Sequence, residues 1–172
     1  GILAAAHAIE QSCDVYMYQL GLKLGVDNLA KYYSGCGFGV PTGIEISGEM
    51  PGLVPTTAYY DRRYGKRGWT QALVMNNSIG QGEVLVTPLQ LTQFYCGLAN
   101  HGTVYKPHLV RAITYPDGRR QVATPTVAFN LPFSQATLQV LYEGLFLVVN
   151  GDRGTARSLR GKGYTVGGKT GT

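Results

Sequence analysis

The sequence predicts an α+β domain in which helical segments flank a β-hairpin. Residues 87–102 and the segment after Ser134 combine helix start signals with apolar residues at helical spacing. Residues 12–24 repeat that spacing, which indicates a third helix. Short β-rich runs within residues 104–122 flank a turn sequence, which indicates the hairpin.

Composition places the chain among folded domains. The 172 residues are 44% hydrophobic and 15% charged, whereas disordered segments are rich in charge and poor in apolar residues. The 24 glycines follow no Gly-X-Y period, so they indicate turns rather than collagen. No apolar run reaches the roughly 18 residues of a membrane helix. The net charge is +5, but the basic groups lack the interleaved aromatic residues of a single-strand binder, so no nucleic acid partner is expected.

The helix at residues 87–102 has the clearest signals. Thr87 is placed to cap it, Pro88 suits the first helical position, and Gln90 completes a capping box. Gly102 fits the end of the helix. The later helix is expected to be capped by Ser134. Its apolar face would comprise Leu138, Leu141, Leu145 and Val148.

The first half of the chain predicts less regular structure. Two apolar stripes in residues 12–24 predict a helix that is buried on most sides. Asp27 is expected to cap a short helix over residues 28–34. Residues 35–82 are rich in glycine, proline and threonine and predict a long, functional loop. Trp69 within it is interpreted as a tucked aromatic anchor, with a cleft wall or partner surface as the alternative.

The turn sequence Pro116-Asp117-Gly118-Arg119 separates two β-rich runs. It predicts the tip of the hairpin. The three cysteines have neither disulfide-framework nor zinc spacing, so we expect small buried residues. The three histidines are isolated in sequence, and no metal or cofactor is predicted.

Two interpretations compete for the end of the sequence. Residues 163–170 match the phosphate-binding pattern Gly-x-x-x-x-Gly-Lys-Thr, which needs a buried strand before it and a helix after it. The preceding residues 157–162 are basic instead. The alternative is Lys-Thr-Gly on a strand edge, where Lys169 supplies charge, Thr170 and Thr172 supply hydroxyl donors, and Gly171 admits a substrate backbone.

A second polar group stands at Ser12-Cys13-Asp14. The simplest interpretation is a helix cap, in which Ser12 or Asp14 accepts hydrogen bonds from free backbone N–H groups. The functional alternative is a hydroxyl that relays a proton beside an acceptor that orients a substrate amide.

Taken together, these motifs resemble the class B penicillin-binding proteins, most closely the penicillin-binding protein 2 group of cell elongation. Ser12-Cys13-Asp14 is similar to the second active-site motif of that family, and the similarity continues in order along the chain. The further matching segments are Gly37-Phe38-Gly39, Thr42-Gly43-Ile44-Glu45, Ser78-Ile79-Gly80-Gln81-Gly82-Glu83, Thr87-Pro88-Leu89-Gln90, Lys106-Pro107-His108-Leu109-Val110, Gly154-Thr155-Ala156 and Lys169-Thr170-Gly171-Thr172.

The resemblance implies the fold of DD-peptidases and serine β-lactamases, represented by its helical subdomain, a β-hairpin and the Lys-Thr-Gly edge strand. It implies a peptidoglycan D,D-transpeptidase that forms a serine acyl-enzyme with stem peptides ending in D-Ala-D-Ala and is blocked by β-lactam antibiotics. Ser12 would pass a proton to the leaving nitrogen, and Lys169 would assist that transfer. Thr170, Gly171 and Thr172 would bind the substrate. Asp14 replaces the usual asparagine and would orient a substrate amide.

The nucleophile that the resemblance requires is absent from this sequence. None of the six lysines has serine three positions before it, so the chain has no Ser-x-x-Lys motif. We therefore expect residues 1–172 to be an incomplete transpeptidase domain, truncated at both ends and inactive alone.

The resemblance also implies a cellular location and partner proteins. The parent would lie at the extracytoplasmic face of the bacterial inner membrane, held by an anchor outside this chain, among membrane proteins of cell elongation. Alternatives are a β-lactamase or carboxypeptidase, a sensing or scaffold domain of the same fold, and a nucleotide-binding P-loop protein.

Overall fold

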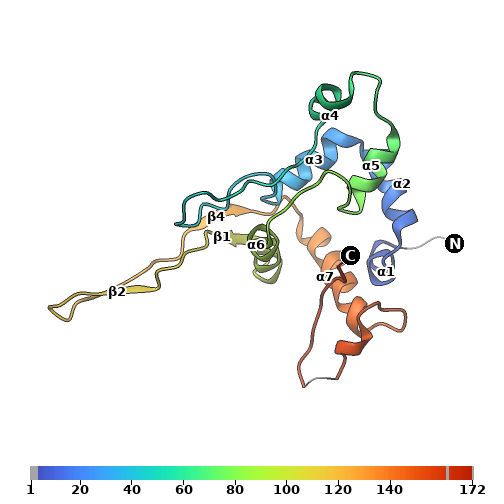
Figure 1. Cartoon of the computed structure of the whole chain (residues 1–172). Coiled ribbons are helices and arrows are strands. Elements are labelled where there is room, and N and C mark those ends of the chain that lie inside the picture. The colour runs from blue at the N-terminus through green and yellow to red at the C-terminus, as the bar shows by residue number, and fades with distance from the viewer. Residues whose placement is uncertain (1–3, 162, 172) are drawn as a thin grey trace. The chain divides into compact units, whose positions relative to one another are not determined.

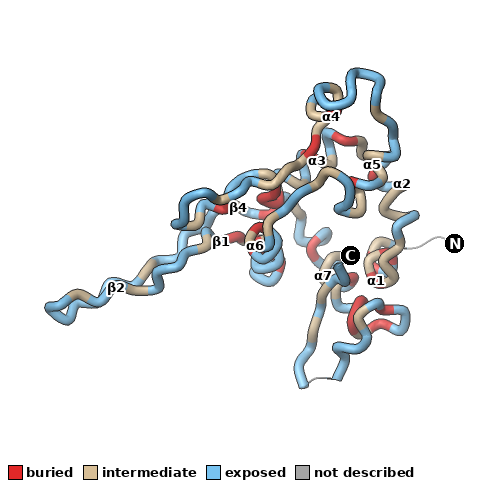
Figure 2. Tube along the Cα trace, in the orientation of Figure 1, coloured by how far each residue is buried: buried red, intermediate tan, exposed pale blue. Residues whose placement is uncertain are grey.

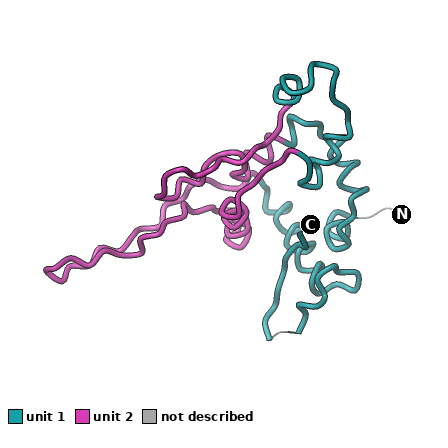
Figure 3. Tube along the Cα trace, in the orientation of Figure 1, with its two compact units in different colours: residues 1–29, 57–82, 133–172 teal, residues 30–56, 83–132 magenta. Residues whose placement is uncertain are grey.

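A computed structural model describes residues 4–161 and 163–171, which divide into two compact units (Figures 1 and 3). The first unit comprises residues 1–29, 57–82 and 133–172, and the second comprises residues 30–56 and 83–132. The regular elements of the described residues are helices and short antiparallel strands, in agreement with the predicted α+β class.

The first unit is helical. Its elements are α1 (Ala5–Glu10), α2 (Asp14–Leu24), α4 (Thr57–Tyr64), α5 (Gln71–Ser78), α7 (Gln135–Asn150) and the 3₁₀ helix η1 (Arg157–Leu159). Helix α3 (Val26–Gly35) begins in this unit and continues into the second. The short α1 carries no strong sequence signal and was not predicted.

Helix α7 confirms its sequence signals and supports α1. The Ser134 hydroxyl accepts from the backbone N–H of Thr137 at 3.2 Å, and Leu138 and Val148 are buried. Gly144 brings the two helices close together, because a Cβ added there would lie 2.9 Å from the Cβ of Ile9. Helix α1 is therefore packed directly on α7, which places the residues that follow α1 beside those that follow α7.

The predicted long loop contains two helices, so that prediction was wrong. Helices α4 and α5 are held by tertiary contacts, since Tyr60 and Val74 are buried with Val26 in one hydrophobic cluster. Trp69 packs on this cluster, its ring centroid 5.3 Å from that of Tyr60, and its Nε1 donates to Asp61 Oδ1 at 2.8 Å. This contact confirms the interpretation of Trp69 as a tucked anchor.

Two expectations near α2 also need correction. Only Gly21 of α2 is buried, and Val15 is 63% exposed, so this helix is not covered on most sides within the described residues. Asp27 lies inside the first turn of α3 and accepts from the backbone N–H of Thr57 at 2.8 Å. The carboxylate thus joins α3 to the start of α4.

The second unit is organised around α6 (Pro88–Ala99). Its capping box is confirmed, with Gln90 N donating to Thr87 Oγ1 at 3.1 Å and Thr87 N donating to Gln90 Oε1 at 2.8 Å. The Gln90 side chain is buried, and its Nε2 donates to the carbonyls of Val40 and Pro51 at 2.7 and 2.8 Å. One side chain therefore begins the helix and secures the long segment before it.

Four short strands form two antiparallel pairs in this unit. β1 (Thr103–Tyr105) pairs with β4 (Val127–Asn130), with an irregularity between Val104 and Tyr105. β2 (Ala112–Thr114) pairs with β3 (Arg120–Val122) across the predicted turn, which confirms the hairpin. The β2–β3 residues are largely exposed (Figure 2).

The cysteines differ in burial. Cys36 is buried, and its burial raises the pKa of the thiol to about 12, whereas Cys96 is exposed, contrary to expectation. Within residues 4–161 and 163–171, no helix has the length and apolar character needed to cross a membrane.

Candidate active site

Ser12 occupies a strained backbone position between α1 and α2. Its φ is 50°, in the left-handed region that non-glycine residues rarely adopt. The backbone N–H of Cys13 donates to Ala8 O at 2.9 Å, and that of Ser12 donates to Ile9 O at 3.2 Å, the pattern that terminates a helix with a left-handed residue. Ser12 therefore ends α1. The predicted cap of α2 was wrong, because the N-cap Cys13 makes no side-chain capping bond and Asp14 lies in the first turn.

The hydroxyl of Ser12 meets Lys169, as predicted. Lys169 Nζ donates to Ser12 Oγ at 2.5 Å although the residues are 157 positions apart. The same ammonium donates to Thr170 Oγ1 at 3.2 Å and Thr170 O at 3.4 Å. Ser12 Oγ and Thr170 Oγ1 are 3.5 Å apart. We call Ser12, Lys169 and Thr170 the Lys169 cluster.

The electrostatics of Lys169 reflect partial desolvation. Removal from water lowers the pKa of its ammonium, and the carboxylate of Asp14 opposes this effect by raising it. Asp14 is exposed on the first turn of α2. The structure thus places the third predicted residue where its charge acts on the lysine.

The Lys-Thr-Gly segment is held by α7. Gly168 N donates to Leu145 O at 3.0 Å, and Asn150 Nδ2 donates to Val166 O at 2.9 Å. Residues 163–171 pair with no strand in the described part of the chain, so the expected edge strand is absent there. A strand is defined by pairing with a neighbouring strand, and the described residues supply none beside this segment.

The structure describes two of the three residues predicted to bind substrate beside Lys169. A Cβ added to Gly171 would meet no atom of the described residues within 4 Å, so these residues leave space beside its backbone. Thr170 is exposed within the Lys169 cluster. Thr172 lies outside the described residues.

Sequence reasoning missed two residues beside the cluster. Thr155 Oγ1 lies 3.2 Å from Thr170 Oγ1, and the buried Glu10 carboxylate accepts from the backbone N–H of Arg153 at 3.0 Å. Gly154-Thr155-Ala156 was a recognisable motif, but its contact with Thr170 depends on tertiary structure. No local signal identifies Glu10, whose partner is 143 positions away.

The phosphate-binding interpretation lacks its structural context. Residues Arg157–Leu159 form a 3₁₀ helix with no buried residue, where that motif needs a buried strand. Among residues 4–161 and 163–171, no three His, Cys, Asp or Glu side chains are grouped to hold a metal ion.

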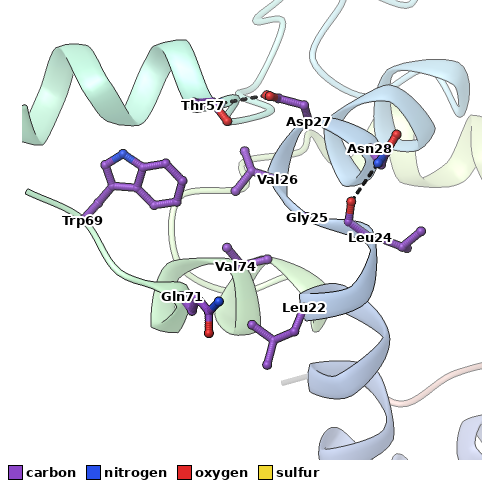
Figure 4. Close-up of a pocket in the computed structure, with 10 residues that line it drawn as sticks. All are labelled: Leu22, Leu24, Gly25, Val26, Asp27, Asn28, Thr57, Trp69, Gln71 and Val74. Carbon is purple, nitrogen blue, oxygen red and sulfur yellow. Dashed lines mark hydrogen bonds between the residues drawn. The ribbon is translucent and has the colours of Figure 1, made fainter. Parts of the chain in front are cut away.

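A separate hollow of about 380 Å³ lies between the end of α2 and α5 (Figure 4). Trp69 and Val74 line it with the Leu22 side chain. Neither Ser12 nor Lys169 lines this hollow. It therefore belongs to the packing around Trp69 rather than to the Lys169 cluster.

Comparison with known proteins identifies the class. The family profile of the penicillin binding protein transpeptidase domain matches residues 2–172. The chain therefore belongs to the penicillin-binding protein transpeptidase domain family, and the predicted resemblance is confirmed.

Relatives within this family are peptidoglycan D,D-transpeptidases named MrdA. The protein from Haemophilus influenzae is 36% identical over 96% of this chain, and that from Acinetobacter baumannii is 33% identical over 100%. The chain spans 25% of the length of each. These relatives are named as transpeptidases, so the sensing and nucleotide-binding alternatives are not favoured.

Solved structures agree on the fold. Pseudomonas aeruginosa PBP2, in complex with WCK 5153, superposes with a TM-score of 0.82 at 34% identity, over 99% of this chain and 38% of that one. The PBP2 of Helicobacter pylori, in a complex with MreC, gives a TM-score of 0.80 at 30% identity, over 97% of this chain and 30% of that one. The expected transpeptidase fold is confirmed.

Proposed function

We propose that this chain forms part of a serine D,D-transpeptidase that cross-links peptidoglycan stem peptides. The observation that carries the proposal is the 2.5 Å hydrogen bond from Lys169 Nζ to Ser12 Oγ. Membership of the transpeptidase family supports it. The nucleophilic serine of a Ser-x-x-Lys motif would come from sequence outside residues 1–172, which form an incomplete domain.

The first half-reaction forms an ester. The outside serine gives its hydroxyl proton to a base that lies outside these residues, and its oxygen bonds to the carbonyl carbon of the penultimate D-Ala while the bond to the terminal D-Ala nitrogen breaks. That nitrogen needs a proton. Ser12 Oγ accepts a hydrogen bond from the Lys169 ammonium. The hydrogen of the Ser12 hydroxyl can therefore point toward the leaving nitrogen. Lys169 then replenishes Ser12. The proton held by the outside base balances the one that Lys169 gives up.

Substrate binding follows from the neighbouring groups. The Lys169 charge and the Thr170 hydroxyl suit a substrate carboxylate, with Thr172 as a further donor. The open space at Gly171 admits the peptide backbone. Asp14 accepts hydrogen bonds when ionised, so it would orient a substrate N–H rather than a carbonyl.

The second half-reaction releases the enzyme. An amine of a neighbouring stem peptide attacks the ester carbon, its proton returns through the same groups, and the serine hydroxyl is regenerated. A β-lactam would enter by the first step and remain on the serine. No cofactor is required by either step.

The proposed parent acts at the extracytoplasmic face of the bacterial inner membrane, anchored by a segment outside this chain. Its proposed partners are membrane proteins of cell elongation. The solved complex of a PBP2 with MreC supports this idea.

Labelled penicillin tests the proposal. In the full-length parent, Lys169→Met is expected to slow covalent labelling by about 100-fold or more, because it removes both the charge and the proton donor. Lys66→Met is the matched control, since Lys66 is an exposed lysine of the helical unit outside the cluster. The isolated 172-residue chain is expected to stay unlabelled. Equal labelling of the two variants, or a covalent band on the isolated chain, would refute the proposal.

A further inference from the structure

A further hydroxyl touches the Lys169 cluster from the loop that follows α7. Thr155 Oγ1 lies 3.2 Å from Thr170 Oγ1 and is separated from it by only 15 positions of chain. Thr170 Oγ1 also accepts a hydrogen bond from Lys169 Nζ at 3.2 Å. With the longer contact to Ser12 Oγ at 3.5 Å, the Thr170 hydroxyl is contacted by three side chains within the protein.

The donors and acceptors around the Thr170 hydroxyl limit where its hydrogen can point. A hydroxyl has one hydrogen and two acceptor lone pairs. Lys169 occupies one lone pair, because an ammonium can only donate. If Thr155 donates to the other lone pair, the single Thr170 hydrogen points either toward Ser12 Oγ, which at 3.5 Å is at the limit of a hydrogen bond, or outward, where Thr170 is exposed. The outward orientation is the one a substrate carboxylate needs, and a charged acceptor there forms a stronger hydrogen bond than the long contact with Ser12.

The position of Thr155 is fixed independently of Thr170. The Glu10 carboxylate holds the backbone N–H of Arg153 at 3.0 Å, and Ala156 N donates to Val148 O at 2.9 Å. Gly154 packs so closely on α7 that an added Cβ would overlap the carbonyl of Val148. The residues on both sides of Thr155 are therefore secured to α1 and α7.

We propose that Thr155 is a positioning residue that directs the Thr170 hydroxyl hydrogen toward the substrate carboxylate. This inference rests on the proposed transpeptidase function. It goes beyond the active-site motifs because Thr155 acts through Thr170. Its removal should weaken recognition of the carboxylate and leave the nucleophile and the proton transfer in place.

The test compares two substrates in the full-length parent. One is a stem-peptide analogue with a free C-terminal carboxylate, and the other is its C-terminal carboxamide. Thr155→Val keeps the side-chain shape but removes the donor. It is expected to raise KM for the carboxylate substrate about tenfold, the effect of one hydrogen bond to a charged group. The kcat and the KM for the carboxamide should change little. Thr155→Ser, which keeps the hydroxyl that Thr155→Val removes, should show the carboxylate preference of the wild type.

Thr165→Val is the matched control, because Thr165 is an exposed threonine in the same segment as Lys169. Identical behaviour of Thr155→Val and Thr165→Val, or failure of Thr155→Ser to restore the preference, would overturn the inference.

Thr170→Val separates this inference from the proposed function. If the carboxylate preference survives Thr170→Val, the proposed role of Thr170 fails and the role of Thr155 fails with it. If Thr170→Val loses the preference and Thr155→Val keeps it, only the inference about Thr155 fails. If Thr170→Val and Thr155→Val both lose the preference and Thr155→Ser keeps it, the result supports the roles of Thr170 and of Thr155.

Discussion

Ser12 combines a functional hydroxyl with an unfavourable backbone conformation. A left-handed residue that carries a Cβ costs free energy that glycine avoids, and such strain is often found at functional sites. The position ends α1 and faces Lys169 Nζ at 2.5 Å. A serine there is explained by the proposed proton transfer rather than by helix termination.

Substitution of Ser12 should separate stability from activity. Ser12→Gly and Ser12→Ala both remove the hydroxyl, but only alanine keeps a Cβ at a φ of 50°. Ser12→Gly is therefore expected to be more stable than Ser12→Ala by about 1 kcal/mol, while both lose penicillin labelling to the same extent. Thermal unfolding and labelling of the full-length parent measure the two effects. Higher stability of Ser12→Ala would contradict this account of the backbone.

The buried Glu10 carboxylate should make the stability of the fold depend on pH in the acid range. The hydrogen bond from His7 lowers the pKa of the carboxyl below 4.5, burial opposes this, and the backbone N–H of Arg153 adds to the lowering. A carboxylate with a lowered pKa stabilises the fold at neutral pH, and this contribution is lost as the pH falls through the folded-state pKa.

Glu10→Gln should thus lower the free energy of unfolding at neutral pH by about 2 kcal/mol, because a hydrogen-bonded charge is removed. The difference from wild type should shrink as the pH is lowered below 4.5. Urea unfolding across this range measures it. A difference that is independent of pH would show that the ionised carboxylate is not responsible.

At the scale of elements, α6 depends on one buried amide. Gln90 closes the capping box with its oxygen and donates through Nε2 to the carbonyls of Val40 and Pro51, 50 and 39 positions away. A segment with little regular structure of its own is therefore attached to the helix N-terminus. The Gln90 side chain thus both caps α6 and holds the preceding segment to it.

Gln90→Glu tests this attachment with almost no change of shape. A carboxylate oxygen would replace the donor and face two carbonyl oxygens, so we expect a loss of at least about 2 kcal/mol of stability. Gln139→Glu is the matched control on the exposed surface of α7. Similar thermal midpoints for the two variants would show that the amide donors contribute little.

The elements that sequence predicts well are those with local signals. Helices α6 and α7 were predicted because caps and apolar spacing agree within each segment. Helices α4 and α5 were missed because the cluster of Tyr60, Val74 and Val26 joins residues far apart in sequence. Their stability is tertiary, and composition gives little sign of it.

Some residues of the candidate site could likewise be predicted from local motifs, whereas others could not. Ser12 and Lys169 were found because each stands in a recognisable motif, and the structure brings them together. Thr155 and Glu10 gain significance only from contacts with Thr170 and Arg153, which the local sequence does not encode. The strand predicted at the Lys-Thr-Gly segment has no pairing partner among the described residues, since a strand needs a neighbouring strand beside it.

At the scale of the whole molecule, the chain spans 25% of its Haemophilus relative and leaves apolar side chains exposed. Val15 on α2 and Leu91 on α6 are 63% and 43% exposed. Further protein would cover side chains of this kind if it packed on these helices. This agrees with the proposal that residues 1–172 form part of a larger transpeptidase domain.

In the proposed proton transfer, Ser12 and Lys169 act as one unit although they are 157 positions apart. A double-mutant cycle on penicillin labelling of the full-length parent measures this directly. Residues that act as a unit have strongly non-additive effects. Ser12→Ala combined with Lys169→Met should therefore label about as slowly as the worse single variant, whereas Ser12→Ala combined with Lys66→Met should show additive effects. Multiplication of the two single losses in the Ser12 and Lys169 double variant would contradict the account.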